Sequence, residues 1–169
     1  MVSPELIRRY PFFARLEPKQ LSLLGQSAED LTVEPGHVFF REEEEVDKFY
    51  LVVDGTVAIV MEVPDRSSEQ PLSGQLTGEI RTEDVVVSTV GSGEVFGWSA
   101  LVPPPEASAG AKAVTECRVI AFDANEIRGQ FEDDCRFAYL LTQKAATVMR
   151  ERLRDMRIES LTLHQKQDE

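Results

Sequence analysis

GEVFGWSAL, residues 93–101, is the stretch of the chain that decides the fold. A short helix that begins near Gly97 offers backbone N–H groups without intrahelical partners, together with the positive end of its dipole. Such a helix start accepts an anion with little help from side chains. Gly97 has no Cβ, so the backbone can come close to a ligand there. A helix that begins at Gly97 would therefore let residues 93–101 hold a small anionic group.

The sequence on both sides of this stretch predicts short strands joined by tight turns. The strand segments are rich in Val, Ile, Phe and Tyr, and they are interrupted by Gly and Pro. Short strands with turns between them favour a closed or rolled antiparallel architecture over a parallel sheet. The expected strands are Thr32–Phe40, Lys48–Val63, Val85–Val90 and Ala111–Phe122, with turns at Pro35-Gly36, Asp54-Gly55 and residues 91–93.

Two other segments in this region are predicted to be loops. Pro64–Asp84 is polar and interrupted by Ser, Pro and Gly, which indicates a long hairpin loop outside the core. Glu42–Glu45 is a run of four like charges. A metal cage needs well-spaced oxygen ligands, so we interpret this run as a solvated loop tip.

Helical patterns flank the expected strands at both ends. Glu17–Asp30 predicts a short amphipathic helix with Pro18 in its first turn. From Cys135 to Leu163, apolar or small residues recur at alternating steps of three and four, which is a heptad pattern. We call this row the seam; it consists of Tyr139, Thr142, Ala146, Met149, Leu153, Met156, Ser160 and Leu163.

A second apolar row widens the face of this long helix in its first half only. A helix with that pattern packs on its own domain first and then on a partner helix. The simplest partner is the same helix of a second subunit, which gives a two-fold homodimer; the alternative is a helix that merely covers the strands. The second row consists of Ala138, Leu141, Ala145 and Val148.

Residues 93–101 resemble the phosphate-binding cassette of the cyclic-nucleotide-binding domain family, which also includes the catabolite activator protein. The family pattern reads Gly-Glu-x-Phe-Gly-Glu-x-x-Leu, followed about ten residues on by Arg and a small residue. The resemblance implies a short helix that begins near Gly97, and it covers roughly residues 10–155. Further matches lie at Pro35-Gly36, at Tyr50-x-Val52-x-x-Gly55-x-Val57 and at Ala113–Cys117.

This resemblance implies a mainly β fold with flanking helices. Its centre would be a double-stranded antiparallel β-helix, a jelly-roll-like β-roll, followed by a long C-terminal helix. We expect residues 1–132 to form the β-roll with its N-terminal helices, and residues 133–169 to form the dimerisation helix and a tail. The ligand-binding residues that the resemblance implies are Phe96, Gly97, Trp98, Ser99, Ala100, Ala107, Ser108, Ala109 and Arg152.

Two positions depart from the family pattern where the family holds a cyclic nucleotide. In the family, a Glu binds the ribose hydroxyl and an Arg pairs with the cyclic phosphate; here those positions are Trp98 and Ala107. Losing one charge-assisted hydrogen bond costs about 1.5–3 kcal/mol, so the missing Arg alone weakens binding by about one or two orders of magnitude. We expect weakened affinity for cAMP or cGMP.

Trp98 and Arg152 each have a functional and a purely structural interpretation. Trp98 either plugs the pocket as part of the core, which we favour, or stacks on a different ligand, one that is aromatic or apolar. Arg152 lies near the position from which the family's long helix reads the base. Its alternative is an ordinary surface role, paired with Glu151 or Asp155.

Three further residues bear on the cassette. Lys112 and Arg118 follow it on the next strand and are, with Arg152, the cations considered as substitutes for the missing Arg. Glu43 occupies the position where the family commonly has a Gly, in the turn after Arg41. The turn there is therefore expected to differ in shape.

Composition limits the classes of partner. The chain has 30 acidic and 18 basic residues and a formal net charge of −12, which argues against a direct nucleic-acid partner. Cys117 and Cys135 form no CxxC pair and have no nearby His, so neither a disulfide framework nor a zinc site is indicated. We see no secretory leader and no apolar run of about 18 residues, so we expect a cytoplasmic protein without membrane contact.

The chain offers little that indicates an enzyme. His37 and His164 are its two histidines and lie far apart, whereas cupin-type metal sites need clustered His. No Ser or Cys lies in a recognisable nucleophile turn, so we expect no catalysis. The few residues after the seam are too short for a helix-turn-helix, so we expect no DNA reading by that route.

Two functional hypotheses remain. In the first, the chain is a regulatory sensor module: a small ligand, either a cyclic nucleotide or a different one, binds residues 96–109 and shifts the dimer helix. In the second, the pocket is collapsed and ligand-free, and a dimeric interaction module docks a basic protein partner on its acidic surface. The intact Gly97 turn favours the sensor, and no other cofactor is indicated.

Overall fold

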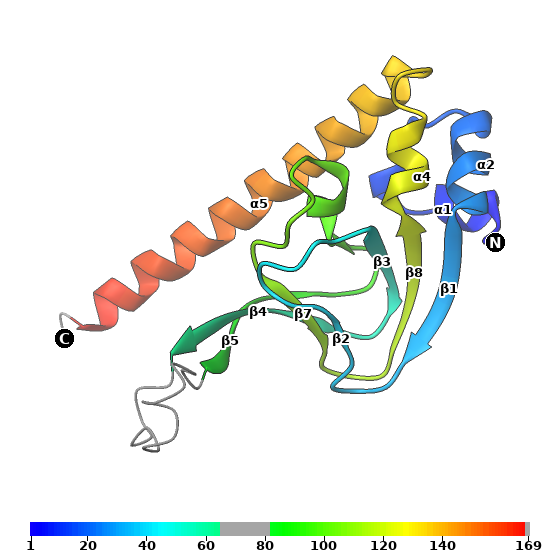
Figure 1. The fold of residues 1–169 in the computed structure, drawn as a ribbon. Helices are drawn as coiled ribbons and strands as arrows, with labels where there is room; N and C mark the ends of the chain where they lie inside the picture. The colour runs from blue at the N-terminus through cyan, green and yellow to red at the C-terminus, as the bar shows by residue number, and fades with distance from the viewer. Residues whose placement is uncertain (65–81, 168–169) are drawn as a thin grey trace, which may run out of the picture.

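The computed structural model describes residues 1–64 and 82–167, and the side chains of those residues as far as Arg157 (Figure 1). The strands are β1 (Ala28–Val33), β2 (Val38–Phe40), β3 (Lys48–Asp54), β4 (Val57–Pro64), β5 (Thr82–Val90), β6 (Val95–Phe96), β7 (Gly110–Ala113) and β8 (Cys117–Asp123). The helical segments are α1 (Pro4–Arg8), η1 (Pro11–Phe13), α2 (Pro18–Gln26), η2 (Trp98–Leu101), α4 (Ala124–Gly129) and α5 (Cys135–Gln167).

The strands form two antiparallel sheets of four strands each. One sheet has the order β1-β8-β3-β6 and the other has the order β2-β7-β4-β5. The chain passes from one sheet to the other at most connections, which winds the two sheets into a jelly-roll-like β-roll. Figure 1 shows α1, α2 and α4 at one end of the roll and α5 crossing beside η2. The fold class predicted from the sequence is confirmed.

The central strand β3 explains where the core lies. Phe49–Val52 are buried at successive positions, because both faces of this strand are covered. On the inner face, the rings of Tyr50 and Phe96 stack with their centres 4.9 Å apart. Both rings also contact Phe40 of β2 in the second sheet. On the outer face, the ring of Phe49 stacks on Phe122 at 4.7 Å, and Phe13 of η1 lies 5.2 Å from Phe122. The N-terminal helices are therefore part of the same core.

Three predicted elements have different bounds in the structure. The helix expected over residues 17–30 ends at Gln26, because residues 28–33 pair with β8 along six positions. The strand expected over residues 111–122 is divided between β7 and β8, because the chain changes sheets there. The loop expected over residues 64–84 is shorter, because Pro64 belongs to β4 and residues 82–84 belong to β5. Residues 65–81 of the expected loop lie outside the described residues.

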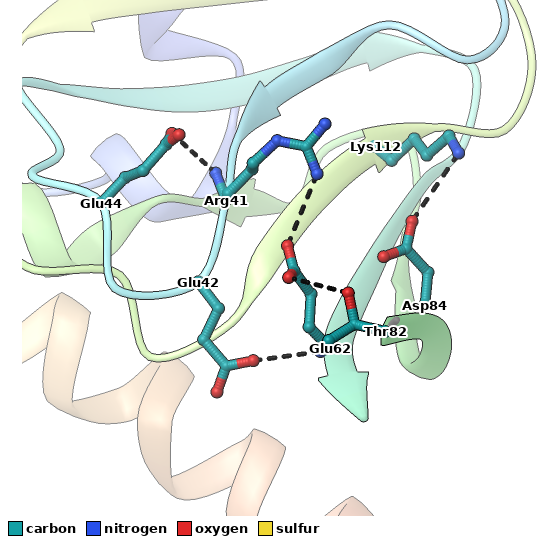
Figure 2. Close-up of polar contacts among 7 residues, drawn as sticks. All are labelled: Arg41, Glu42, Glu44, Glu62, Thr82, Asp84 and Lys112. Carbon is teal, nitrogen blue, oxygen red and sulfur yellow. Dashed lines mark hydrogen bonds and ion pairs between the residues drawn. The ribbon is translucent and has the colours of Figure 1, made fainter. Parts of the chain in front are cut away.

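The acidic run at residues 42–45 is anchored through its backbone, although its side chains lie mostly at the surface. The amide of Glu43 donates to the carbonyl of Ala107 at 2.8 Å, and the amide of Ala107 donates to the carbonyl of Glu44 at 2.9 Å. Figure 2 shows the side chains: the Glu42 carboxylate accepts from the amide of Glu62 at 3.0 Å. The run therefore fixes the segment around Ala107 and is more than a solvated tip.

Glu43 adopts a left-handed backbone conformation with φ of 64°. Non-glycine residues pay about 1–2 kcal/mol there, while glycine costs about 0.5–1 kcal/mol of extra chain entropy. We expect Glu43→Gly to raise the free energy of unfolding by about 0.5–1 kcal/mol, measured by urea unfolding with Trp98 fluorescence. Glu45→Gly is the control, since it removes the same charge at a residue without positive φ and should lower stability. A loss of stability in Glu43→Gly would contradict this account.

Asp134 holds the start of α5. Its carboxylate accepts hydrogen bonds from the Phe137 amide and from Gln20 Nε2 of α2, both at 2.9 Å. These bonds favour the ionised form, so the pKa of Asp134 lies below its usual value, with the Gln20 bond as the largest cause. A carboxyl with a lowered pKa stabilises the fold above its unfolded-state pKa, and this contribution is lost as the pH falls through its folded-state pKa.

Asp134→Asn tests this anchoring, because Asn keeps an N-cap oxygen and does not titrate. We expect the variant to lose less free energy of unfolding than the wild type between about pH 5 and about pH 3, in urea titrations at each pH. Asp133→Asn is the control, since that carboxylate accepts no hydrogen bond in the described part of the chain. An acid response identical to the wild type in Asp134→Asn would show that the Gln20 and Phe137 bonds do not matter.

Candidate ligand-binding site

A cavity of about 460 Å³ lies between the second sheet, η2 and α5. We call it the sheet cavity. Strand residues such as Phe40, Ile59 and Met61 make most of its wall apolar, and α5 closes one side with Arg152, Asp155 and Met156. The cavity is therefore shared between the β-roll and the long helix.

Gly97 is required at the turn into η2. Its φ is 71°, and a Cβ would lie 3.1 Å from the Lys48 carbonyl oxygen and 3.3 Å from the Phe40 ring. Both the left-handed backbone and the tight contacts disfavour a side chain at this position. The short helix predicted to begin near Gly97 is confirmed as a 3₁₀ turn whose Ala100 amide donates to the Gly97 carbonyl at 3.0 Å.

Most of the residues singled out from the sequence line the sheet cavity, and two do not. Ala100 and Ala107 are 0% and 3% exposed and point into the core. The resemblance places the family's Arg at position 107. In this chain the residue there is Ala107, which packs in the core. The predicted residues that line the cavity are Phe96, Gly97, Trp98, Ser99, Ser108, Ala109 and Arg152.

The indole of Trp98 is half-buried and forms part of the cavity wall. The interpretation of Trp98 as a plug does not agree with this arrangement, because about 460 Å³ remains open beside the ring. Trp98 is thus presented to whatever enters the cavity.

Arg152 is attached to the β-roll. Its Nη1 donates to the Thr89 carbonyl at 3.1 Å, and its Nη2 lies 3.7 Å from Glu94 Oε1. Only 22% of its side chain is exposed. The expected pairing with Glu151 or Asp155 is wrong, because the guanidinium reaches across to β5 and to the turn before β6.

The other two candidate cations point elsewhere. Arg118 donates to both carboxylate oxygens of Asp30, at 3.0 and 2.7 Å, and this bond lowers the pKa of Asp30. Lys112 Nζ lies 3.8 Å from Asp84 Oδ2, among the polar contacts drawn in Figure 2. Among the described residues, Arg152 is therefore the cation that lines the sheet cavity. Asp155 is the acidic residue in the same wall.

Sequence reasoning missed the walls supplied by the β4–β5 hairpin and by the end of α5. Alternation along β4 signals Ile59 and Met61 on one face, and Asp155 and Met156 lie one turn beyond Arg152. Neither signal says that the two elements face one another. The missed lining residues are Phe40, Ile59, Met61, Val87, Ser88, Val90, Val95, Asp155 and Met156.

Residues 30–134 match the family described as Cyclic nucleotide-binding domain. The chain belongs to this family. Over 129 residues it is 22% identical to the CRP-like cAMP-activated global transcriptional regulator of Mycobacterium tuberculosis, a match covering 76% of this chain and 50% of the regulator. The chain thus spans about half the length of the curated regulator that it matches. The family and this relative are regulatory rather than enzymatic.

Solved structures give the same fold for this cyclic nucleotide-binding domain. A protein from Geobacter metallireducens, provisionally named a cyclic nucleotide-binding protein, is 27% identical with a TM-score of 0.73, and the match covers 90% of this chain and 99% of that one. The sensor domain of the transcriptional regulator DNR from Pseudomonas aeruginosa shares the fold at 22% identity and a TM-score of 0.63, over 88% and 89% of the two chains.

The described residues of the domain show neither a metal-binding cluster nor a membrane-spanning helix. No three His, Cys, Asp or Glu side chains there are grouped so as to hold a metal ion. No helix in that part of the chain is long and apolar enough to cross a membrane.

The attachment of Arg152 is open to a direct test. We expect Arg152→Gln to lower the free energy of unfolding by about 0.5–1.5 kcal/mol and to speed hydrogen exchange in residues 148–157. Arg150→Gln is the matched control, because Arg150 is an exposed cation of the same helix that does not line the sheet cavity. Equal exchange in both variants would refute a role for Arg152 in holding α5.

Proposed function

We propose that this domain is a regulatory sensor that binds a small ligand in the sheet cavity and signals through α5. The observation that carries the proposal is that α5 supplies Arg152, Asp155 and Met156 to the cavity wall. A ligand that contacts both the roll and the helix changes the balance between helix positions, as linkage requires. Occupancy is thereby coupled to the part of α5 beyond the roll.

The cavity supports a compact, largely apolar or aromatic ligand of low charge. Trp98 provides a flat ring for stacking, and Ser99 and Ser108 provide hydroxyls that orient a polar group. The cation on the wall, Arg152, is already engaged by Thr89 and Glu94. A cyclic phosphate therefore gains little there, and we infer that cAMP and cGMP bind weakly.

We further propose that α5 pairs with α5 of a second copy along the seam. The second apolar row faces the roll, since Leu141 and Ala145 are fully buried. The seam is exposed at Tyr139 and Leu153, by 63% and 49%, whereas Met156 is 50% exposed and also lines the sheet cavity. Exposed apolar side chains at heptad spacing support a helix-to-helix dimer. The side chains of Ser160 and Leu163 lie outside the described residues.

The proposal also covers the compartment, the lack of catalysis and the division of the chain into a sensor and a helix. The domain would act in the cytoplasm without catalysis or direct nucleic-acid contact, with residues 1–132 as the sensor and 133–169 as the helix and tail. The acidic surface and the exposed seam also support the alternative of a protein-interaction module with a basic partner. The open cavity favours the sensor over that alternative.

Titration with four probes tests the ligand assignment: cAMP, cGMP, adenosine and naphthol, by calorimetry and by Trp98 fluorescence. We expect adenosine to bind within about threefold of cAMP, because among the described residues the cavity offers the phosphate no unengaged cation. Ser108→Arg adds a guanidinium to the wall and should strengthen cAMP binding about tenfold while leaving adenosine unchanged. Thr32→Arg adds the same charge on the exposed side of β1 and should change neither.

Two outcomes would contradict the assignment. Micromolar cAMP binding that weakens at least tenfold on removal of the phosphate would mean that the cavity holds an anion. No heat and no Trp98 signal with any probe at millimolar concentration would favour the interaction module.

A further inference from the structure

A second cavity, of about 440 Å³, lies on the other side of Arg152. We call it the helix cavity, because it is bounded by α5, by η1 and by the turn before β6. It shares Val95, Arg152 and Asp155 with the sheet cavity, but neither η2 nor residues 107–109 lines it. The proposed sensor function makes no use of this space.

One end of the helix cavity carries two cations, Arg15 and Lys144. Lys144 Nζ lies 3.4 Å from the Pro11 carbonyl oxygen and 5.9 Å from the centre of the Phe12 ring. Neither Arg15 nor Lys144 lies within ion-pair distance of a carboxylate among the residues that the structure describes. Burial and then the charge of Arg15 lower the pKa of Lys144, so this positive charge is poorly compensated.

The carboxylates of the helix cavity lie away from this end. Glu151 and Asp155 follow Lys144 on α5 by seven and eleven residues, which is roughly 10 and 16 Å along a helix. Glu94 is occupied by Arg152 at 3.7 Å and by the Gly91 amide at 2.7 Å. The cationic end is therefore separate from the acidic end.

Apolar side chains also line the helix cavity, and the backbone at the cationic end is strained. Phe12 and Leu140 lie beside Lys144, and Val148 lies one turn further along α5 toward the acidic end. Arg15 has a φ of 73°, a left-handed conformation that non-glycine residues adopt at a cost. The chain thus holds Arg15 at the cavity rim against its own preference.

We propose that the helix cavity binds a small organic acid, with its carboxylate at Arg15 and Lys144 and its apolar body against Phe12 and Leu140. Charge-assisted hydrogen bonds to a carboxylate supply the compensation that the two cations lack. Gln143 and Thr147 lie within a turn of Lys144 and add neutral hydrogen-bonding groups. An inorganic anion would satisfy the charges and leave the apolar surface uncovered, so the site fits an acid with an apolar body.

Calorimetry with indole-3-acetate and with its uncharged amide, indole-3-acetamide, tests the proposal on the full chain. We expect saturable binding of the acid and binding of the amide that is at least tenfold weaker. Lys144→Gln should weaken binding of the acid at least tenfold, and Lys144→Arg should restore it to within about threefold. Arg150→Gln, an exposed cation of the same helix, should bind the acid like the wild type.

The opposite results would overturn the proposal. Equal affinity for the acid and the amide, or no saturable binding of the acid at millimolar concentration, would show that the cations do not form a carboxylate site. An equal loss in Arg150→Gln and Lys144→Gln would reduce the effect to net charge. Urea unfolding of Lys144→Gln, expected to match the wild type closely, separates loss of the site from loss of the fold.

Discussion

The position of α5 against the β-roll is the constraint on which both cavities depend. In its first half the helix is fixed by apolar packing, with Phe137, Leu141 and Ala145 fully buried. Beyond Val148 the second apolar row ends, and Arg152 reaches the roll through polar contacts with Thr89 and Glu94. Polar contacts of this kind contribute less than buried apolar area. The half of α5 that closes the sheet cavity is therefore the half held less firmly, which suits a helix that responds to a ligand.

The domain keeps the backbone of its family and changes the chemistry of the pocket. Gly97 still makes the left-handed turn that brings η2 to the cavity. Trp98 and Ala107 replace the two polar side chains that the family pattern has, and Ala107 is turned into the core. The same scaffold then encloses a mainly apolar space, so the sensor function and the identity of the ligand are separable properties of the fold.

The sequence was sufficient for the turns, the strands and the long helix, since these follow from local patterns such as Gly97, Pro35-Gly36 and the heptad seam. It was insufficient for features set by distant residues. Helix α2 ends at Gln26, earlier than expected, because β1 pairs with β8. Arg152 forms an ion pair with Glu94 and not with a neighbour on its own helix. The resemblance aligned Ala107 with an Arg position, but an alignment does not tell that the side chain faces inward.

The second half of α5 closes the cavity beside Trp98. A bimane fluorophore on Met156→Cys tests this closure, in a Cys135→Ser background that leaves the buried Cys117, because Trp98 quenches bimane only at close range. We expect a quenched label that regains emission when Trp98→Phe is added, and no such gain for a label at Arg150→Cys. Equal emission from the position-156 label with and without Trp98 would show that α5 does not close this cavity.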